Sequence, residues 1–196
     1  MIFHKPSKQA MVHPPKTGTI TMHNFLRAAG WKALPNTHAK TERFIKDYPN
    51  LNDYTIYGFF RDPLKRFESA VLYVKRTPNV SKNFEKIVLQ NGFDKTAEMT
   101  SYDTVVDIFL SLKDAMPVFF RPQTVWLDHP KVTTLDFDNF ESELRRITGD
   151  YKNEIPVLNK STDFGRSVIT DKVREFVRDY YAADYQFAKD VLGKEY

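Results

Sequence analysis

The feature that most constrains the fold is a short apolar segment, residues 9–13, that runs through a turn into an amphipathic segment, residues 19–29. The turn contains Pro-Pro-Lys-Thr-Gly, and Gly30 follows the second segment, where a glycine commonly ends a helix. This passage predicts a buried strand, a tight turn and a helix that begins at Thr19. The N–H groups at such a helix start carry partial positive charge and bind tetrahedral oxyanions.

A second junction of the same kind lies downstream. Residues 54–60 are rich in aromatic and β-branched side chains, as expected of a central strand, and Arg-Asp-Pro-Leu-Lys-Arg-Phe-Glu-Ser follows at residues 61–69. Aspartate caps helices well, and proline suits the first helical position. Two basic turns, each after a strand, indicate a ligand with two separated phosphate-type groups.

The remaining pattern predicts an α/β fold. We expect a helix capped by Asp138 and ended by Gly149, strands at residues 31–34 and 132–137, and helices at residues 41–48, 62–74, 81–91, 101–113 and 170–192. Strands that alternate with helices favour a parallel sheet covered on both faces. A chain of 196 residues suits one domain, residues 1–196. Ligands of such sheets bind beyond the carboxyl ends of the strands, where both basic turns fall.

Composition narrows the function classes. The net charge of +4 suits an anionic ligand, but no Lys/Arg-rich run or aromatic RNA-binding motif accompanies it, so we expect no nucleic-acid partner. No segment approaches the roughly 20 apolar residues of a membrane span, and the first residues lack the apolar core of a secretory signal. The absence of cysteine excludes disulfides and thiolate metal sites and is typical of a reducing compartment. We therefore expect a cytoplasmic protein. Since the sequence offers no clustered metal ligands, we also expect that it needs no metal.

Together the two basic motifs resemble the nucleotide signatures of sulfotransferases that use 3′-phosphoadenosine-5′-phosphosulfate, particularly the carbohydrate (Golgi-type) branch. Their order and separation also match. The lack of an anchor and of cysteines indicates a small soluble member of bacterial or phage type. The resemblance implies a P-loop-like fold of three layers, with a central parallel β-sheet flanked by helices. It also implies sulfuryl transfer to an acceptor hydroxyl on a glycan or a small molecule.

The resemblance assigns roles to two groups of residues. Arg61 and Ser69 would hold the 3′-phosphate. Lys16 would bond the oxygen that leaves during transfer, and the 5′-phosphosulfate would lie against Lys16, Thr17, Gly18, Thr19, Ile20 and Thr21. The family usually has threonine or serine at the position of Ile20, so Thr19 or Thr21 must supply that hydroxyl or it is lost.

A base must deprotonate the acceptor, and the chain has five histidines. His38 is the predicted catalytic base, because the family has a His-Ala-Thr-like segment between its two signatures and imidazole has a near-neutral pKa. The alternative is a loop histidine that caps the next helix. We expect His4 and His129 to face solvent. Should His38 not serve, the next candidates are His13 at a strand end, His23 on a helix surface, and Glu42.

Several residues keep two interpretations. Arg66 could face the nucleotide, or pair with Glu68 or solvent. Arg121 and Gln123 could line the acceptor cleft or form a surface turn. Asp184 lies on the apolar stripe of the last predicted helix, so we expect a buried structural acceptor. A loop that resembles the family's cofactor-covering segment contains Lys160, Ser161 and Arg166.

Two other function classes stay open. A P-loop kinase acting on a small molecule would need an aspartate near the turn to hold Mg²⁺, and the leading glycine of a Walker A sequence is absent. A non-catalytic binder of anionic glycans would bind glycans without a nucleotide.

Overall fold

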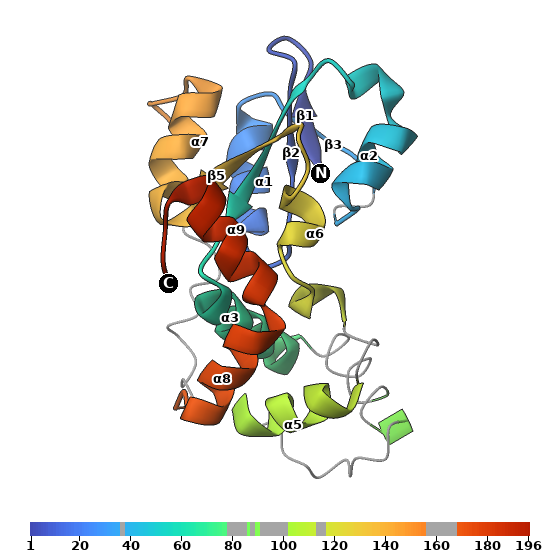
Figure 1. Ribbon diagram of the computed structural model, residues 1–196. Coiled ribbons are helices and arrows are strands. Elements are labelled where there is room, and N and C mark those ends of the chain that lie inside the picture. Colours follow the sequence, from blue (N-terminus) through green and yellow to red (C-terminus); the bar gives the residue numbers. More distant parts are fainter. Residues whose placement is uncertain (36–37, 78–85, 87–88, 91–101, 113–116, 156–167) are drawn as a thin grey trace. The chain divides into compact units, whose positions relative to one another are not determined.

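The computed structural model describes residues 1–35, 38–77, 86, 89–90, 102–112, 117–155 and 168–196 (Figure 1). The chain divides into two compact units. The first unit comprises Met1–Asp62, Pro122–Asn159 and Ala183–Tyr196, and the second comprises Pro63–Arg121 and Lys160–Ala182. Most of the helix expected over residues 81–91 lies outside the described residues, as do Lys160, Ser161 and Arg166.

The first unit contains a mixed five-stranded sheet in the order β3-β1-β2-β4-β5. Strands β2 (Gln9–Val12), β4 (Thr55–Phe60) and β5 (Val132–Asp136) run parallel. Strand β1 (Ile2–His4) runs antiparallel to β2 and to β3 (Lys32–Ala33). The prediction of a parallel sheet is therefore wrong at this edge. A four-residue connection joins β1 to β2, and so short a loop permits only antiparallel pairing.

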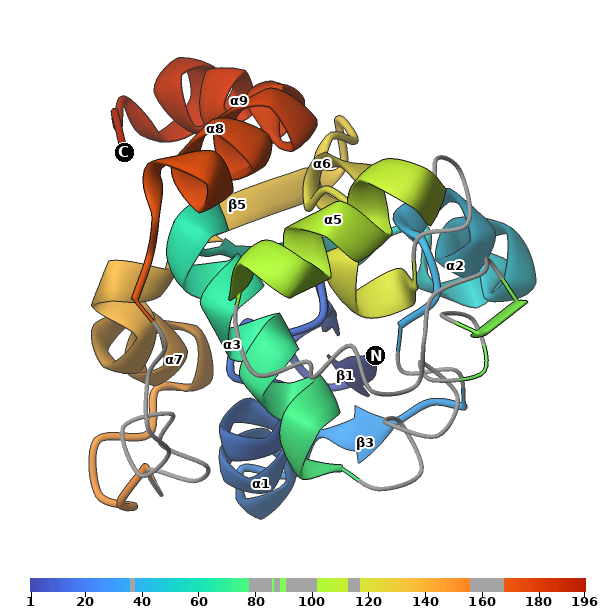
Figure 2. The same cartoon turned by 90° about the horizontal axis from the view of Figure 1, so that it is seen from below.

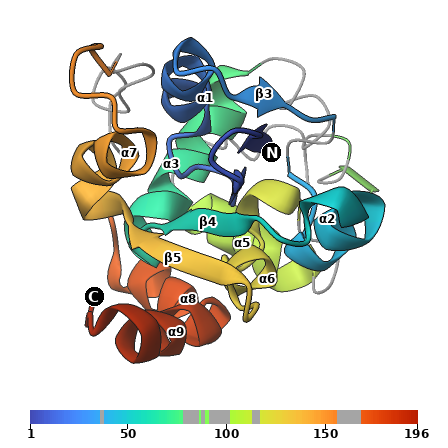
Figure 3. The same cartoon turned by 90° about the horizontal axis from the view of Figure 1, so that it is seen from above.

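Helices cover both faces of this sheet (Figure 3). Helices α1 (Thr19–Ala28) and α7 (Phe140–Thr148) lie on one face, over a core that includes Met11, Phe25 and Phe59. Helices α6 (Thr124–Leu127) and α9 (Ala182–Leu192) lie on the other, and α2 (Thr41–Asp47) packs against α6. The unit is thus an α/β structure whose strands β2 and β4 carry the two predicted basic turns at their carboxyl ends.

Gly58 sets the spacing between β4 and α6. A Cβ atom there would overlap the Leu127 side chain and approach Val12 Cγ2 to 2.8 Å. Only a residue without a side chain lets the helix lie this close to the strand.

The second unit is helical and packs around Phe67. Helices α3 (Pro63–Arg76), α5 (Tyr102–Leu112) and α8 (Asp171–Tyr180) lie beside one another (Figure 2). The ring of Phe67 contacts Phe109, Phe120 and Phe176. Helix α3 begins at Pro63, as predicted. The single helix predicted over residues 170–192 is wrong, because the chain leaves helical geometry at Tyr181, between α8 and α9.

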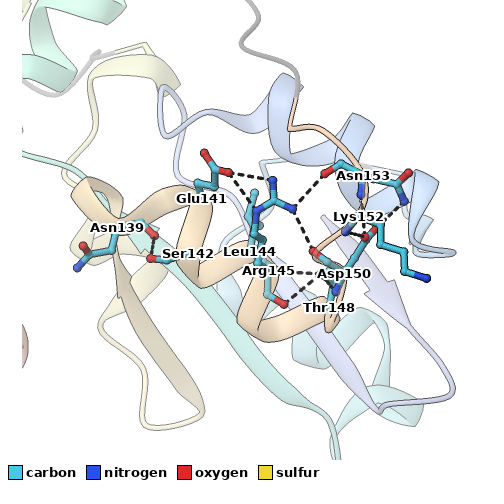
Figure 4. Close-up of polar contacts among 9 residues, drawn as sticks. All are labelled: Asn139, Glu141, Ser142, Leu144, Arg145, Thr148, Asp150, Lys152 and Asn153. Carbon is cyan, nitrogen blue, oxygen red and sulfur yellow. Dashed lines mark hydrogen bonds and ion pairs between the residues drawn. The ribbon is translucent and has the colours of Figure 1, made fainter.

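Helix α7 ends at Gly149, as predicted, with that glycine in the left-handed region at φ 67°. Arg145 donates to the Glu141 carboxylate and to the backbone carbonyls of Asp150 and Asn153 (Figure 4). The Asp150 carboxylate accepts in turn from the Asn153 amide. Polar side chains from the same stretch of chain therefore fix the segment that follows this helix end.

The start of α7 differs from the prediction. A short 3₁₀ helix, η3 (Phe137–Asn139), precedes it, and the capping carboxylate is that of Asp136, which accepts from the Asp138 N–H at 3.0 Å. The predicted cap, Asp138, lies inside this turn. Among the ranges described above, no helix has the length and apolarity needed to cross a bilayer.

Candidate anion-binding site

The turn between β2 and α1 adopts an uncommon backbone conformation. Lys16 and Gly18 both lie in the left-handed region, with φ values of 71° and 72°. Thr17 is buried and donates its hydroxyl to the Pro14 carbonyl at 2.7 Å. A Cβ on Gly18 would lie only 3.0 Å from the Phe140 ring, so this position requires glycine for both its φ and its surroundings.

Among the described residues, no acidic side chain caps the start of α1. Gly18 is the cap residue, no side-chain hydrogen bond caps the helix, and its first turn contains no acidic residue. The amides of a first helical turn have no intrahelical acceptors. The Thr19 hydroxyl is buried and finds no hydrogen-bond partner among the described residues, whereas the Ile20 side chain is 53% exposed. This helix start is therefore electrostatically prepared for an anion.

Arg61 joins the second predicted motif to this turn. Its Nη1 donates to the Lys16 carbonyl at 3.0 Å, and its guanidinium lies over the Phe137 ring at 5.0 Å from the centroid. The structure thus brings Lys16 and Arg61 together within the first unit. Ser69 lies half-buried in α3 of the second unit, so its pairing with Arg61 on one phosphate stays a prediction.

Gln123 has a role that neither interpretation of the sequence anticipated. It is fully buried, and its side-chain amide accepts from Arg61 N–H at 2.9 Å and donates to the Arg61 carbonyl at 2.7 Å. Asp184 is also fully buried and accepts from the backbone N–H groups of Gln123 and Thr124, at 2.9 and 3.0 Å. The prediction that Asp184 is a buried structural acceptor is confirmed. Arg121 is exposed.

Hydrogen bonds fix both the ring and the backbone of His38. Its Nδ1 lies 3.0 Å from the His13 carbonyl, an acceptor, so Nδ1 carries the proton and Nε2 keeps its lone pair. Trp126 donates its indole N–H to the His38 carbonyl at 3.1 Å, and Thr41 donates to the Trp126 carbonyl. Burial lowers the pKa of His38, and the nearby Lys16 ammonium lowers this pKa further, against the opposing effect of the His13 hydrogen bond. The imidazole is therefore neutral and able to accept a proton.

The buried His13 and the half-buried His23 form an imidazole pair beside the turn. Their Nε2 atoms lie 2.8 Å apart, so one ring donates to the other. Burial lowers the pKa of both, that of His23 to about 4. His13 is a core residue as one interpretation held, but the expectation that His23 is a surface residue is wrong. Its ring turns inward because His13 is its hydrogen-bond partner.

The other two histidines are not simply solvent-facing. His4 belongs to β1 and stacks on Trp31, with ring centroids 5.7 Å apart. His129 is half-buried, and its Nδ1 accepts from the Lys131 N–H. Both residues remain partly exposed, so the expectation that they face solvent holds in part, and each ring also contacts a partner.

Arg66 lies inside the second unit and is fully buried. Its guanidinium donates to the carbonyls of Phe119 and Arg121 and lies over the Tyr181 ring. These contacts are typical of a side chain that packs within its own unit.

Among the described residues no group of three or more histidine, aspartate and glutamate side chains is arranged to hold a metal ion. No protein-family model, curated protein or solved structure matches the chain.

Proposed function

We propose that the protein transfers a sulfuryl group from 3′-phosphoadenosine-5′-phosphosulfate to an acceptor hydroxyl. One observation carries the proposal: a helix start with no acidic residue in its first turn lies close to a lysine and to a neutral, oriented imidazole. An anionic donor needs the first two, and deprotonation of a hydroxyl needs the third. The P-loop-like character of the proposed fold lies in β2, the turn and α1, next to the parallel strands β4 and β5.

The residues of the turn fit a phosphosulfate. The α1 start offers backbone amides, Lys16 a positive charge, and Thr19 a buried hydroxyl that has no partner in the described part of the chain. That hydroxyl replaces the one that Ile20 lacks, while Ile20 contributes its amide. Arg61 and Ser69 are the proposed ligands of the 3′-phosphate, through a guanidinium fork and a hydroxyl.

The proposed chemistry divides the work between two residues. The donor supplies an activated sulfuryl group. His38 Nε2 accepts the proton of the acceptor hydroxyl as that oxygen bonds to sulfur and the bond from sulfur to the 5′-phosphate oxygen breaks. Lys16 neutralises the charge that develops on this phosphate oxygen. A lowered pKa keeps His38 unprotonated at neutral pH, so that Nε2 is available to accept a proton.

The acceptor is proposed as a carbohydrate hydroxyl, with small alcohols as alternatives, and the cell compartment as the cytoplasm. Transfer of labelled sulfate to a panel of glycans and alcohols tests the acceptor. A thermal-shift series tests the donor, since a ligand that binds only the folded state raises the melting temperature. Adenosine 3′,5′-bisphosphate should raise it, and Mg-ATP should do so far less. Stabilisation by Mg-ATP instead would favour a kinase, and stabilisation by a sulfated glycan alone a non-catalytic binder.

Ser69→Ala tests the 3′-phosphate assignment more cleanly than Arg61→Ala, because Arg61 also bonds the turn that would hold the 5′-phosphate. Both changes should weaken binding of adenosine 3′,5′-bisphosphate more than that of adenosine 5′-phosphate. The expected loss is about 1.5–3 kcal/mol, as for a charge-assisted hydrogen bond. Calorimetric titration with both nucleotides measures this, and an equal loss for the two would remove the assignment for Ser69.

A further inference from the structure

We infer that Gln123 is a positioning residue: its side-chain amide, anchored by Asp184, fixes Arg61 and through Arg61 the conformation of the turn that contains Lys16. The effect on donor binding rests on the proposed function, whereas the effect on the turn does not.

The first step is the pairing of Gln123 with Arg61. Arg61 is the first residue after β4, where the chain leaves the sheet ladder. Gln123 Oε1 accepts from its N–H at 2.9 Å, and Gln123 Nε2 donates to its carbonyl at 2.7 Å. A primary amide presents an acceptor and a donor side by side, so it pairs with one peptide residue as a neighbouring strand would. Both backbone groups of Arg61 are thereby fixed.

Asp184 holds Gln123 in place. Asp184 Oδ2 accepts from the Gln123 backbone N–H at 2.9 Å and lies 3.4 Å from its side-chain Nε2. Both residues are fully buried. A buried carboxylate that holds the backbone and borders the side chain leaves Gln123 a single orientation, with Oε1 toward the Arg61 N–H.

Arg61 in turn contacts the turn that contains Lys16. The Arg61 guanidinium donates to the Lys16 carbonyl at 3.0 Å. Lys16 has φ 71°, a conformation that residues other than glycine rarely adopt and that persists where neighbouring contacts hold it. Four segments far apart in the sequence thus form one continuous set of hydrogen bonds that ends at the proposed anion site.

A double-mutant cycle separates positioning from general destabilisation. Gln123→Met keeps the length of the side chain and removes both hydrogen bonds to Arg61. By calorimetry it should weaken binding of adenosine 3′,5′-bisphosphate about 10-fold in the wild-type background, and less than about 2-fold in the Arg61→Ala background. Gln186→Met, at an exposed glutamine on α9, and Ile147→Val, a core change in α7, should leave the affinity unchanged. Equal weakening in both backgrounds would overturn the inference.

A second arm uses the protein without ligand. In ¹⁵N–¹H spectra, Gln123→Met and Arg61→Ala should shift the same amide resonances of residues 17–20, and the two control variants should not. Absence of nucleotide binding by the wild type would refute the proposed function, and the spectra would still decide the positioning role. If Gln123→Met does not fold, Asp184→Asn replaces it and should shift the same resonances to a smaller extent. Unchanged turn resonances in a folded variant would refute the inference.

Discussion

The starts of α1 and α6, both in the first unit, differ in what accepts from their N–H groups, which have no acceptors within the helix. At α6 a buried carboxylate, Asp184, accepts from the N–H groups of Gln123 and Thr124. At α1 no acidic side chain is present in the first turn; Lys16 precedes it, and the Thr19 hydroxyl has no hydrogen-bond partner within the described ranges. A helix start that only supports the fold takes an anion from its own chain. A helix start with a lysine beside it and no acidic residue in its first turn suits an anion from outside the chain.

We expect the largest loss of transfer activity from a change at His38, which tests whether the α1 start belongs to an active site. His38→Ala should reduce sulfuryl transfer by about 10²–10⁴-fold, the range for a lost general base, while nucleotide affinity stays nearly intact. In the wild type the rate should fall only below the ordinary pKa range of imidazole, because burial lowers the pKa of His38. The variant should lose this acidic limb of the pH–rate profile.

His129→Ala serves as the matched control and should transfer sulfate normally. Near-normal transfer by His38→Ala, with its acidic limb unchanged, would direct the search for a base to His13, His23 or Glu42.

The next effect tests the cation at α1. Lys16→Ala should lower the single-turnover rate of transfer by at least ~10²-fold, since it removes a donor from the oxygen on which charge develops. Lys40→Ala, at an exposed lysine before α2, should leave this rate unchanged. A wild-type rate in Lys16→Ala would mean that the lysine at the α1 start has no part in transfer.

A smaller effect tests the internal anion of α6. Asp184→Asn replaces one acceptor oxygen with an amide, so a buried N–H of Gln123 or Thr124 loses its partner. The free energy of unfolding in urea should fall by about 1–3 kcal/mol. Asp190→Asn, at an exposed position on the same helix, should change it by less than about 0.5 kcal/mol. If Asp184→Asn is as stable as the wild type, the carboxylate does not support α6.

The smallest effect concerns the imidazole pair beside α1. The pKa of His23 is lowered to about 4 in the folded chain, whereas an unfolded histidine titrates near 6.5. The unfolded state therefore binds the proton first, and the free energy of unfolding should decrease as the pH falls from about 6.5 to about 4. The ring is half-buried, so its share should not exceed about 1 kcal/mol.

Urea unfolding at pH 7 and pH 4.5 measures this share. His23→Gln should lose less stability between the two pH values than the wild type does. An identical loss in both proteins would mean that other groups cause the acid sensitivity.

Local pattern was sufficient to predict several elements. The strands at Gln9–Val12 and Thr55–Phe60, the helix beginning at Thr19 and the stop at Gly149 follow from apolar spacing and from residues with special backbone preferences. Asp184 was predictable for the same reason, because a charged residue on an apolar stripe must be buried with partners.

The failures share a physical cause, which is dependence on contacts between distant segments. Helical periodicity continues through Tyr181, but its hydroxyl donates to the Phe120 carbonyl, and no local pattern reports that bond. The orientation of His38 depends on the His13 carbonyl and on Trp126, and the role of Gln123 on Arg61. The sequence therefore indicated Lys16, Arg61 and His38 as candidates, whereas the contacts that orient them could not be predicted from it.

Gly58 has a consequence for how the chain can vary. Because Leu127 leaves no room for a side chain on this glycine, an added methyl group would push α6 away from β4. Helix α6 contains Trp126, which bonds the His38 carbonyl, and follows directly on Gln123, which bonds Arg61. A substitution in the middle of a strand would thus disturb the contacts of His38, the proposed base, and of Arg61, a proposed phosphate ligand. We expect the tolerance of this chain to mutation to be lowest here, away from any residue that would touch a substrate.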